Sequence, residues 1–450
     1  MAAIAKNLYD GTSSSVLYTD RRDFYIKPNV VKELYPIVTP FLTFVANFNT
    51  LTGLKDPQFK MFQHTNPWVR QYIAMNDSDD VTTLADNAED ACTISATYSV
   101  GLPSTFTAAL TNLKCSVYAS TTPSAVDGKP TGDALGTVIV TTFTNTTSVS
   151  VKNATAASII IPQYGFLEVI GTEYGEASEA GTGWTDELKV VWNQCGIQRT
   201  PFQLTNVLMK ANLRGESSEY QRMKLQKSQE HQIQKERNMM FSSSPIGTNL
   251  TTADTFADGG LTDADGNALR PTYGVWAAIE DFGVTDTTDD DQNIFSINEA
   301  TYNYSTYVDD SEKAFEYVDD GVQPLFSGRG FMTYWSKLAG PEGGGIAGNS
   351  KWRVGLSDMK SGRLGFNYRE LETPNGIYQL VPTPSITKSP HNMKAIAPGK
   401  DDIFHAIYES PMYAQNIKTD NHPLYQKNEF LSQEGIGITN LPAHKLWKIT

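Results

Sequence analysis

Residues 215–241 read GESSEYQRMKLQKSQEHQIQKERNMMF, and the rest of the chain is arranged around this stretch. It has no proline, and its only glycine is its first residue. Gln, Lys, Glu, Arg and Met dominate it, and their unbranched side chains lose little freedom in a helix. Ser244-Pro245 ends it, because proline cannot continue the hydrogen-bond ladder. We therefore expect one helix of about 26 residues, roughly 39 Å long.

This predicted helix has few apolar residues, and those that share a narrow stripe are Tyr220, Met223, Ile233 and Met240. The other faces carry Lys, Arg and Glu, so we expect the helix to lie along a surface and to pack on one side only. An ordinary exposed helix held by pairs such as Glu219 with Arg222 is the simplest interpretation. A coiled coil is disfavoured, because no a/d heptad of apolar residues persists.

The charge of the 450-residue chain is unevenly distributed. The formal net charge is −14, which argues against nucleic-acid binding by the whole surface. Between Asp254 and Asp320 there are 17 acidic and two basic residues, a balance of −15, so the rest is close to neutral. Residues 205–241 instead hold seven basic residues against four Glu. One part is therefore acidic and another mildly basic, in a chain long enough for two or three domains or one elaborated fold.

Three widely spaced cysteines, Cys92, Cys115 and Cys195, cannot all pair within one chain, and none lies in a CxxC motif. This pattern favours reduced thiols in a cytosolic setting. The N-terminal residues MAAIAKNLYDGTSSS lack the apolar run of a secretory signal peptide. No stretch approaches 18 apolar residues, so we expect no membrane-spanning segment.

Candidate catalytic and binding motifs are incomplete. Residues 343–348 match GxGxxG, but a helix-like stretch precedes them and a strand-like one follows, the reverse of a dinucleotide site. Asp263-Ala-Asp-Gly-Asn267 resembles the start of a calcium loop without its closing Glu. The histidines show no HxxxH or HExxH spacing, and nothing local activates Cys195. We therefore expect no catalytic, cofactor-binding or metal-binding residues, no cofactor and no enzymatic activity.

Four basic residues could face a nucleic acid: Arg214, Arg222, Lys224 and Lys227. No aromatic residues interleave with them, as base stacking would require. Solubilising surface charge is the preferred interpretation, and any phosphate contact would be weak.

The rest of the chain predicts an α+β protein. Residues 1–27 are polar and irregular, as in an extended arm, and a short helix from Asn29 followed by a second turn is expected over 28–48 because Pro36 and Pro40 interrupt it. A β-subdomain is predicted before the long helix, with strands Thr93–Val100, Cys115–Tyr118, Val138–Phe143, Val149–Val151 and Phe166–Ile170. Beyond the long helix we expect helices over Asp310–Val318 and Phe331–Leu338, a hairpin at Asn375-Gly376, and strands Ile403–Tyr408 and His444–Ile449.

The order of these features resembles a known family. The lead-in WNQCGIQRTPFQLT at 192–205 precedes the long helix, and NHPLYQKNEFLSQEG at 421–435 precedes NLPAH at 440–444. The chain is similar to the major capsid proteins of tailed bacteriophages with the HK-97-like fold. It is similar to a branch in which an Asn-Gln lead-in precedes the helix and a Glu-Gly turn precedes the last strand. The resemblance covers most of the chain and is firmest over 164–241 and 382–447.

The resemblance implies an α+β, HK-97-like capsid fold. Its parts would be an N-terminal arm (1–52), an E-loop region (53–200) with an inserted β-subdomain (about 102–163), a peripheral domain (201–300) with the spine helix (about 215–241), an axial domain (301–395) and a return to the peripheral domain (396–450). Some members crosslink their subunits through Lys and Asn, and no such pair is identifiable here.

The function implied is that of a major capsid (head) protein, which self-assembles into the icosahedral shell around the phage genome. The implied partners are copies of itself in hexamers and pentamers, a portal, cement or decoration proteins, and packaged double-stranded DNA through weak non-specific contact, with no membrane. The protein would be assembled in the host cytoplasm and reside in the virion. The alternative is a secreted or surface-layer β-rich binding protein, which the Thr-rich strands suit and the long helix does not. An enzyme ranks third.

Overall fold

A computed structural model describes the protein in two compact units, formed by Met1–Met61 with Val190–Thr450 and by Phe62–Lys189. The first will be called the main unit and the second the inserted unit. The described residues are 39–48, 50–63, 71–77, 81–100, 108–125, 128–182, 188–210, 218–243, 263–267, 269–285, 292–318, 321–338, 360–361, 367–415, 417 and 424–450. The predicted arm (1–27), the helix predicted from Asn29 and the GxGxxG match at 343–348 lie outside them.

The inserted unit is a closed barrel of six strands with antiparallel neighbours. Around the barrel the strands are β10 (Phe166–Thr172), β3 (Tyr72–Met75), β5 (Glu89–Val100), β8 (Ser148–Asn153), β7 (Pro130–Asn145) and β6 (Leu113–Ser120). A short 3₁₀ turn, η1 (Ala108–Leu110), precedes β6, and β4 (Val81–Leu84) pairs with β9 (Ile159–Ile161). All five strands predicted in this part of the sequence are confirmed.

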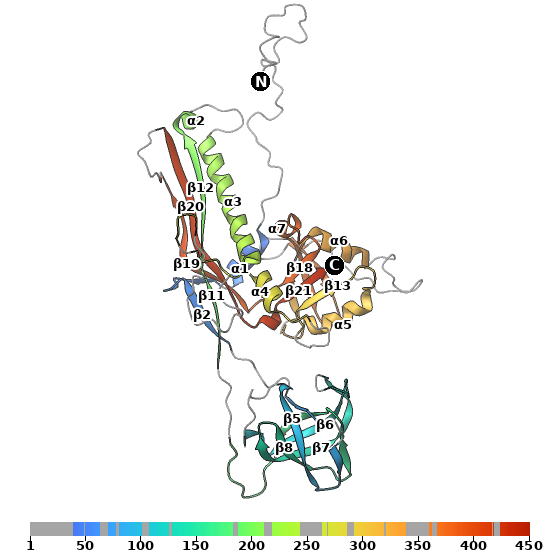
Figure 1. The fold of residues 1–450 in the computed structure, drawn as a ribbon. Helices are drawn as coiled ribbons and strands as arrows, with labels where there is room; N and C mark the ends of the chain where they lie inside the picture. The colour runs from blue at the N-terminus through green and yellow to red at the C-terminus, as the bar shows by residue number, and fades with distance from the viewer. Residues whose placement is uncertain are drawn as a thin grey trace, which may run out of the picture. The chain divides into compact units, whose positions relative to one another are not determined.

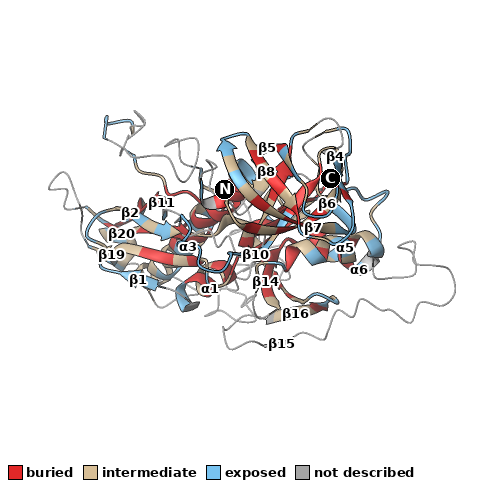
Figure 2. Ribbon diagram, turned by 90° about the horizontal axis from the view of Figure 1, so that it is seen from below, coloured by how far each residue is buried: buried red, intermediate tan, exposed pale blue. Residues whose placement is uncertain are grey.

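Buried residues alternate with more exposed ones along strands of the barrel, and the buried ones point into its interior. Along β8 every second residue is buried, and β6 shows nearly the same period, as strands with one face in a core must (Figure 2). The interior includes Cys92, Cys115, Val140 and Val151, all 0% exposed. Because β3 and β5 lie before residue 102 and β10 lies after residue 163, this unit extends beyond the expected insertion at both ends.

The main unit contains a long four-stranded sheet. Its order is β1 (Thr50–Thr52), β19 (Ile403–Ala414), β20 (Tyr425–Ile438) and β12 (Gly196–Thr205). Strands β12 and β20 are antiparallel and stay in register over ten pairs, from Gly196–Glu434 to Thr205–Tyr425. A two-stranded ribbon, β2 (Gln58–Gln63) with β11 (Lys189–Gln194), leads into β12.

The predicted long helix is confirmed as α3 (Glu219–Phe241), which runs alongside β12 and β20 in Figure 1. It begins at Ser218, whose hydroxyl accepts the N–H of Gln221, and it follows the short α2 (Asn206–Lys210). The predicted apolar stripe is confirmed only in part, because Met240 is buried and Tyr220, Met223 and Ile233 are half-buried. The face that packs against the sheet is instead mainly polar, and its buried residues are His231, Lys235, Glu236, Met239 and Met240.

A second, seven-stranded sheet forms the other part of the main unit. Its order is β13 (Ile294–Ile297), β21 (Lys445–Ile449), β18 (Lys394–Ala397), β14 (Val322–Ser327), β17 (Ile377–Pro382), β16 (Asn367–Glu372) and β15 (Lys360–Ser361). The predicted hairpin at Asn375-Gly376 is confirmed by the antiparallel β16–β17 pair. The predicted strands Ile403–Tyr408 and His444–Ile449 correspond to β19 and β21, with the 3₁₀ turn η2 (Leu441–Ala443) just before β21.

Five short helices complete the described part of the main unit. They are α1 (Pro40–Phe48), α4 (Val275–Phe282), α5 (Tyr304–Ala314), α6 (Arg329–Leu338) and α7 (Pro384–Thr387). Helix α6 was predicted, whereas α5 begins six residues before the predicted Asp310 and ends before Val318. The reason is the cap, since the Asn303 side chain accepts the N–H of Thr306 at 3.1 Å and so starts the helix there.

The barrel core should account for the stability of the inserted unit. Leu167 on β10 is 0% exposed, whereas Ile170 on the same strand is 58% exposed. We expect Leu167→Ala to lower the free energy of unfolding of this unit by about 2–5 kcal/mol, because it leaves a cavity. Ile170→Ala should change it by no more than about 0.5 kcal/mol. Urea unfolding of an excised fragment, residues 62–189, should be cooperative, and equal effects of the two variants would contradict the barrel assignment.

Candidate functional site

Where the structure describes them, the motifs singled out for chemistry form no reactive site. Cys195 is buried, its thiol points at the carbonyl oxygen of Ala406 at 3.7 Å, and burial raises its pKa to about 12. Asp263 closes its own turn by accepting the N–H of Asp265 at 3.0 Å and that of Asn267 at 2.8 Å. Among the described residues, no group of three His, Cys, Asp or Glu side chains is placed to hold a metal ion.

The basic residues of α3 contact neighbours within the chain. Arg222 pairs with Glu219, and the Nζ of Lys227 lies 2.6 Å from a carboxylate oxygen of Glu230. The Nζ of Lys224 lies 4.1 Å from the ring centre of Tyr413 on β19. Arg214 lies outside the described residues. These contacts favour the interpretation as solubilising surface charge. In the described part of the chain, no helix has the length and apolar character needed to span a bilayer.

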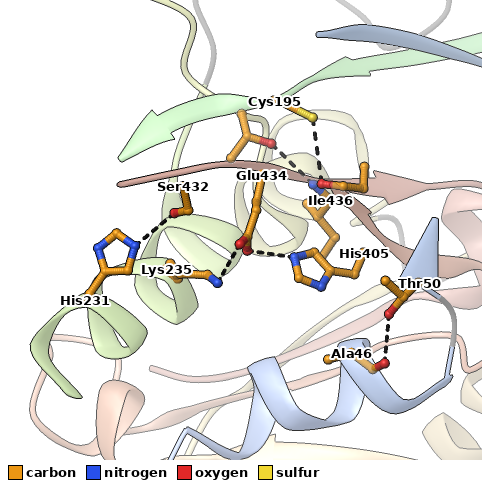
Figure 3. A network of polar contacts seen from close by, with 11 residues as sticks. Ala46, Thr50, Cys195, His231, Lys235, His405, Ser432, Glu434 and Ile436 are labelled. Atoms are coloured by element: carbon orange, nitrogen blue, oxygen red, sulfur yellow. Dashed lines mark hydrogen bonds and ion pairs between the residues drawn. The ribbon is translucent and has the colours of Figure 1, made fainter. Parts of the chain in front are cut away.

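The candidate site is the contact between the C-terminal half of α3 and strand β20, here called the α3 junction. Glu434 of β20 accepts hydrogen bonds on both carboxylate oxygens, from Lys235 Nζ at 2.6 Å and from His405 Nε2 at 2.8 Å. Figure 3 shows its carboxylate between these two side chains. All three residues are at least 93% buried, although Lys235 and Glu434 are 199 positions apart in the sequence.

Electrostatics hold Glu434 in its charged form. Burial raises its pKa, but the hydrogen bond from His405 and the charge of Lys235 outweigh burial, so the pKa lies below its usual value. The carboxylate is therefore ionised at neutral pH. Its stabilising contribution is present at neutral pH and is lost as the pH falls through that depressed value.

A second polar contact lies one helical turn away. His231 contacts Thr200 Oγ1 through Nδ1 at 2.8 Å and Ser432 Oγ through Nε2 at 3.0 Å. Thr200 donates its single hydroxyl hydrogen to Gln234 Oε1 at 2.8 Å, so Nδ1 of His231 is the donor and Nε2 the acceptor. Burial, with a smaller effect of the Lys235 charge, lowers the pKa of His231 and keeps the ring neutral.

The spacing of these pairs matches the geometry of a helix lying along a strand. His231 and Lys235 are four residues apart on α3, and their partners Ser432 and Glu434 are two residues apart on β20. Four helical residues rise about 6 Å and two strand residues about 6.7 Å. The two contacts therefore fix the position of α3 along the sheet.

The lead-in residues Asn193 and Gln194 support the junction from β11. Asn193 donates to the carbonyl oxygens of Tyr273 at 2.9 Å and Ile436 at 2.5 Å, and accepts the N–H groups of Tyr273 at 2.9 Å and Gln194 at 2.8 Å. Gln194 donates to the carbonyl oxygen of Pro271 at 2.8 Å. The Asn-Gln pair therefore ties the end of β11 to the segment before α4 and to β20.

The Glu-Gly motif lies beside this lead-in. A Cβ added at Gly435 would lie 2.7 Å from the carbonyl oxygen of Gln194, so the close approach of β20 requires glycine there. The expected Glu-Gly turn is wrong, because Glu434 and Gly435 lie within β20 and are paired with β19. The Asn193-Gln194 and Glu434-Gly435 pairs, which carried the resemblance, nevertheless lie next to each other in the main unit.

Sequence reasoning missed the buried charges of this junction. Lys235 and Glu434 each look like ordinary surface residues in the sequence, and nothing within a few positions of either one indicates its partner. The one signal in the sequence was the thin apolar stripe of the predicted helix. A helix with so few apolar residues needs polar contacts to attach to a sheet, but the stripe does not indicate which residues make them.

Comparisons with known proteins give structural likenesses only. No family model and no curated protein matches the chain. The capsid of the native GTA particle shares 7% identity over 94% of this chain and 93% of that chain, with a TM-score of 0.45. The Cyanophage Pam1 capsid asymmetric unit shares 12% over 62% and 82% (TM-score 0.38), and the capsid of Myoviridae phage XM1 shares 9% over 62% and 81% (TM-score 0.36). At TM-scores below 0.5 these likenesses do not establish a shared fold.

The ion pair at the α3 junction generates a stability prediction. Lys235→Met removes one partner of a buried pair and leaves Glu434 with His405 alone, so we expect the free energy of unfolding of the main unit to fall by about 3–5 kcal/mol. Lys227→Met, on the same helix, breaks only the more exposed pair with Glu230 and should cost no more than about 1 kcal/mol. Urea denaturation measures both.

The double variant Lys235→Met with Glu434→Leu separates charge burial from lost packing. It removes both charges together, and we expect it to recover most of the loss caused by Lys235→Met. If Lys235→Met were as mild as Lys227→Met, the junction would not depend on this pair.

Proposed function

We propose that this chain is a major capsid protein of a tailed bacteriophage, which self-assembles into the icosahedral shell enclosing the phage genome. The observation that carries the proposal is the one-sided packing of α3. This helix has 23 residues, yet only five are buried, and four of these lie in its last seven positions. A helix roughly 35 Å long with so few buried residues leaves side chains along its length available to other molecules.

Large apolar side chains around this helix and its sheet are exposed. Val207 of α2 is 78% exposed, Leu424 beside the start of β20 is 69% exposed, and Leu225 of α3 is 60% exposed. Val207 and Leu424 are brought close by the hydrogen bond from the N–H of Asn206 to the carbonyl oxygen of Leu424 at 2.9 Å. Grouped apolar residues favour contact with another protein, and identical copies in a closed symmetric assembly can cover such surfaces on every subunit.

Within this proposal, α3 is the spine helix of an HK-97-like fold, in the peripheral domain assigned to 201–300 and 396–450. The axial domain, 301–395, would contain α5, α6, α7 and strands β14 to β17, and its boundary with the return segment would fall within β18. The arm would be 1–52, and the barrel would belong to the E-loop region, 53–200. These boundaries follow the resemblance, and they remain part of the proposal.

The partners proposed are further copies in hexamers and pentamers, a portal, decoration proteins and packaged DNA bound weakly and without sequence preference. The protein would reside in the virion after assembly in the host cytoplasm, and its role would be structural with no enzymatic step. Pairing of Arg222 and Lys227 with acidic neighbours agrees with weak DNA contact, since these charges are already partly neutralised.

Negative-stain electron microscopy of the purified full-length chain tests the function directly. We expect uniform polyhedral shells or ring-shaped capsomers. Planar lattices would favour the surface-layer alternative, and dispersed monomers at all concentrations would contradict self-assembly.

The exposed apolar residue of α3 provides a matched pair of variants. Leu225→Glu replaces apolar surface by charge, and Gln226→Glu places the same charge on the next exposed position without removing apolar surface. We expect Leu225→Glu to reduce the assembled fraction at least tenfold at equal protein concentration, with an unchanged melting temperature, and Gln226→Glu to assemble normally. Sedimentation velocity measures the assembled fraction. Equal assembly of the two variants would exclude Leu225 from the contact.

A further inference from the structure

A second buried carboxylate, Glu236, lies next to the α3 junction and contacts no cation in the described residues. Its Oε2 accepts the backbone N–H of Phe41 at 3.1 Å and that of Leu42 at 3.3 Å. Its Oε1 accepts the hydroxyl of Ser385 in α7. The side chain is 0% exposed, so α3, α1 and α7 meet at a single carboxyl group.

The two N–H groups belong to the first turn of α1, which begins with Pro40. First-turn N–H groups have no partner within their own helix, and α1 has no acidic residue in that turn. Glu236, 195 positions away from Phe41, therefore caps α1 from another element. Apolar packing completes the attachment, since Phe41 and Phe44 each place their ring 5.3 Å from the ring of Phe326.

We propose that protonation of Glu236 controls how firmly α1 is held in the main unit: the neutral carboxyl favours the attached helix, and ionisation weakens the attachment. The protonated form keeps every contact, because its hydroxyl can donate to Ser385 Oγ while the other oxygen still accepts both N–H groups. The ionised form keeps the same contacts but buries a negative charge. Release of α1 would let water reach that charge.

Among the described residues, no charged side chain contacts the Glu236 carboxylate. Helices α1 and α7 contain no titratable residue. Lys235 and His405 are both committed to Glu434. The other titratable groups on the C-terminal half of α3 (231–241), on α4 and next to α7 are His231, Arg237, Glu280, Asp281, Lys388 and His391.

The direction of the effect follows from linkage. Burial raises the pKa of Glu236 from 4.5 to about 7, although the hydrogen bonds from Ser385, Leu42 and Phe41 oppose the shift. A solvated carboxyl ionises near 4.5, so the attached state binds the proton more tightly than the released state. Attachment of α1 is therefore strongest at low pH and weakens as the pH rises through about 7.

Hydrogen exchange of the full-length chain, kept dilute and unassembled, tests this inference. The readout is the protection factor of the α1 amides, which divides out the intrinsic pH dependence of exchange. Between pH 5.5 and 8.5 we expect α1 protection in the wild-type chain to fall about 30-fold, the change that linkage gives for this pair of pKa values. Barrel amides in β8 serve as the internal reference and should not follow the same profile.

Two variants assign the effect to Glu236. Glu236→Gln keeps the shape and cannot ionise, so its α1 protection should be independent of pH over this range. Glu230→Gln, on the same helix, should retain the wild-type profile. Wild-type α1 protection that is constant or rises with pH would overturn the inference even if Glu236→Gln failed to fold, and so would a Glu236→Gln profile identical to wild type. The result does not depend on the proposed function, since it concerns a single chain.

Discussion

The main unit depends on one buried carboxylate, Glu434, which holds a helix and two strands together. Its oxygens bind Lys235 from α3 and His405 from β19. His405 is paired with Ile436, so Glu434 is its diagonal neighbour on the same face of the sheet. A slip of one residue in β20 would turn Glu434 to the opposite face and leave Lys235 buried without a partner. The ion pair therefore specifies register, even where its net contribution to stability is small.

This constraint explains why α3 is attached so unevenly. Its C-terminal half carries the contacts to β20, α1 and α7 and a polar contact to β12, and its end packs into the largest apolar cluster with Met239 and Met240. Its N-terminal half has fewer contacts, which include the hydroxyl pair of Tyr220 with Tyr413 at 2.6 Å, the packing of Tyr220 against Phe202, and Lys224 over the Tyr413 ring. A polar helix that is held by a few directional contacts, and not by a continuous apolar face, leaves much of its length uncovered. The exposed surface of α3, on which the proposed shell function rests, is a consequence of this kind of attachment.

The two units differ in whether their main sheets have edge strands with unpaired backbone groups. The inserted unit closes its sheet into a barrel around its own apolar interior, so its main strands have no free edge. The main unit keeps two open sheets and exposes apolar side chains near the ends of β12 and β20. The main unit therefore has more surface that contact with another copy would cover than the inserted unit has.

The sequence by itself determined the elements whose signals are local. Gln- and Lys-rich helix formers without proline predicted α3, stretches rich in Thr, Ser, Val and Ile predicted the barrel strands, and Asn375-Gly376 predicted the β16–β17 hairpin. Only the tertiary structure decided which face of α3 is buried. Lys235, Glu236 and Glu434 are buried because each meets partners between 29 and 199 positions away. Burial of a charge is favourable only once those partners are in place, and no local pattern records a partner so distant.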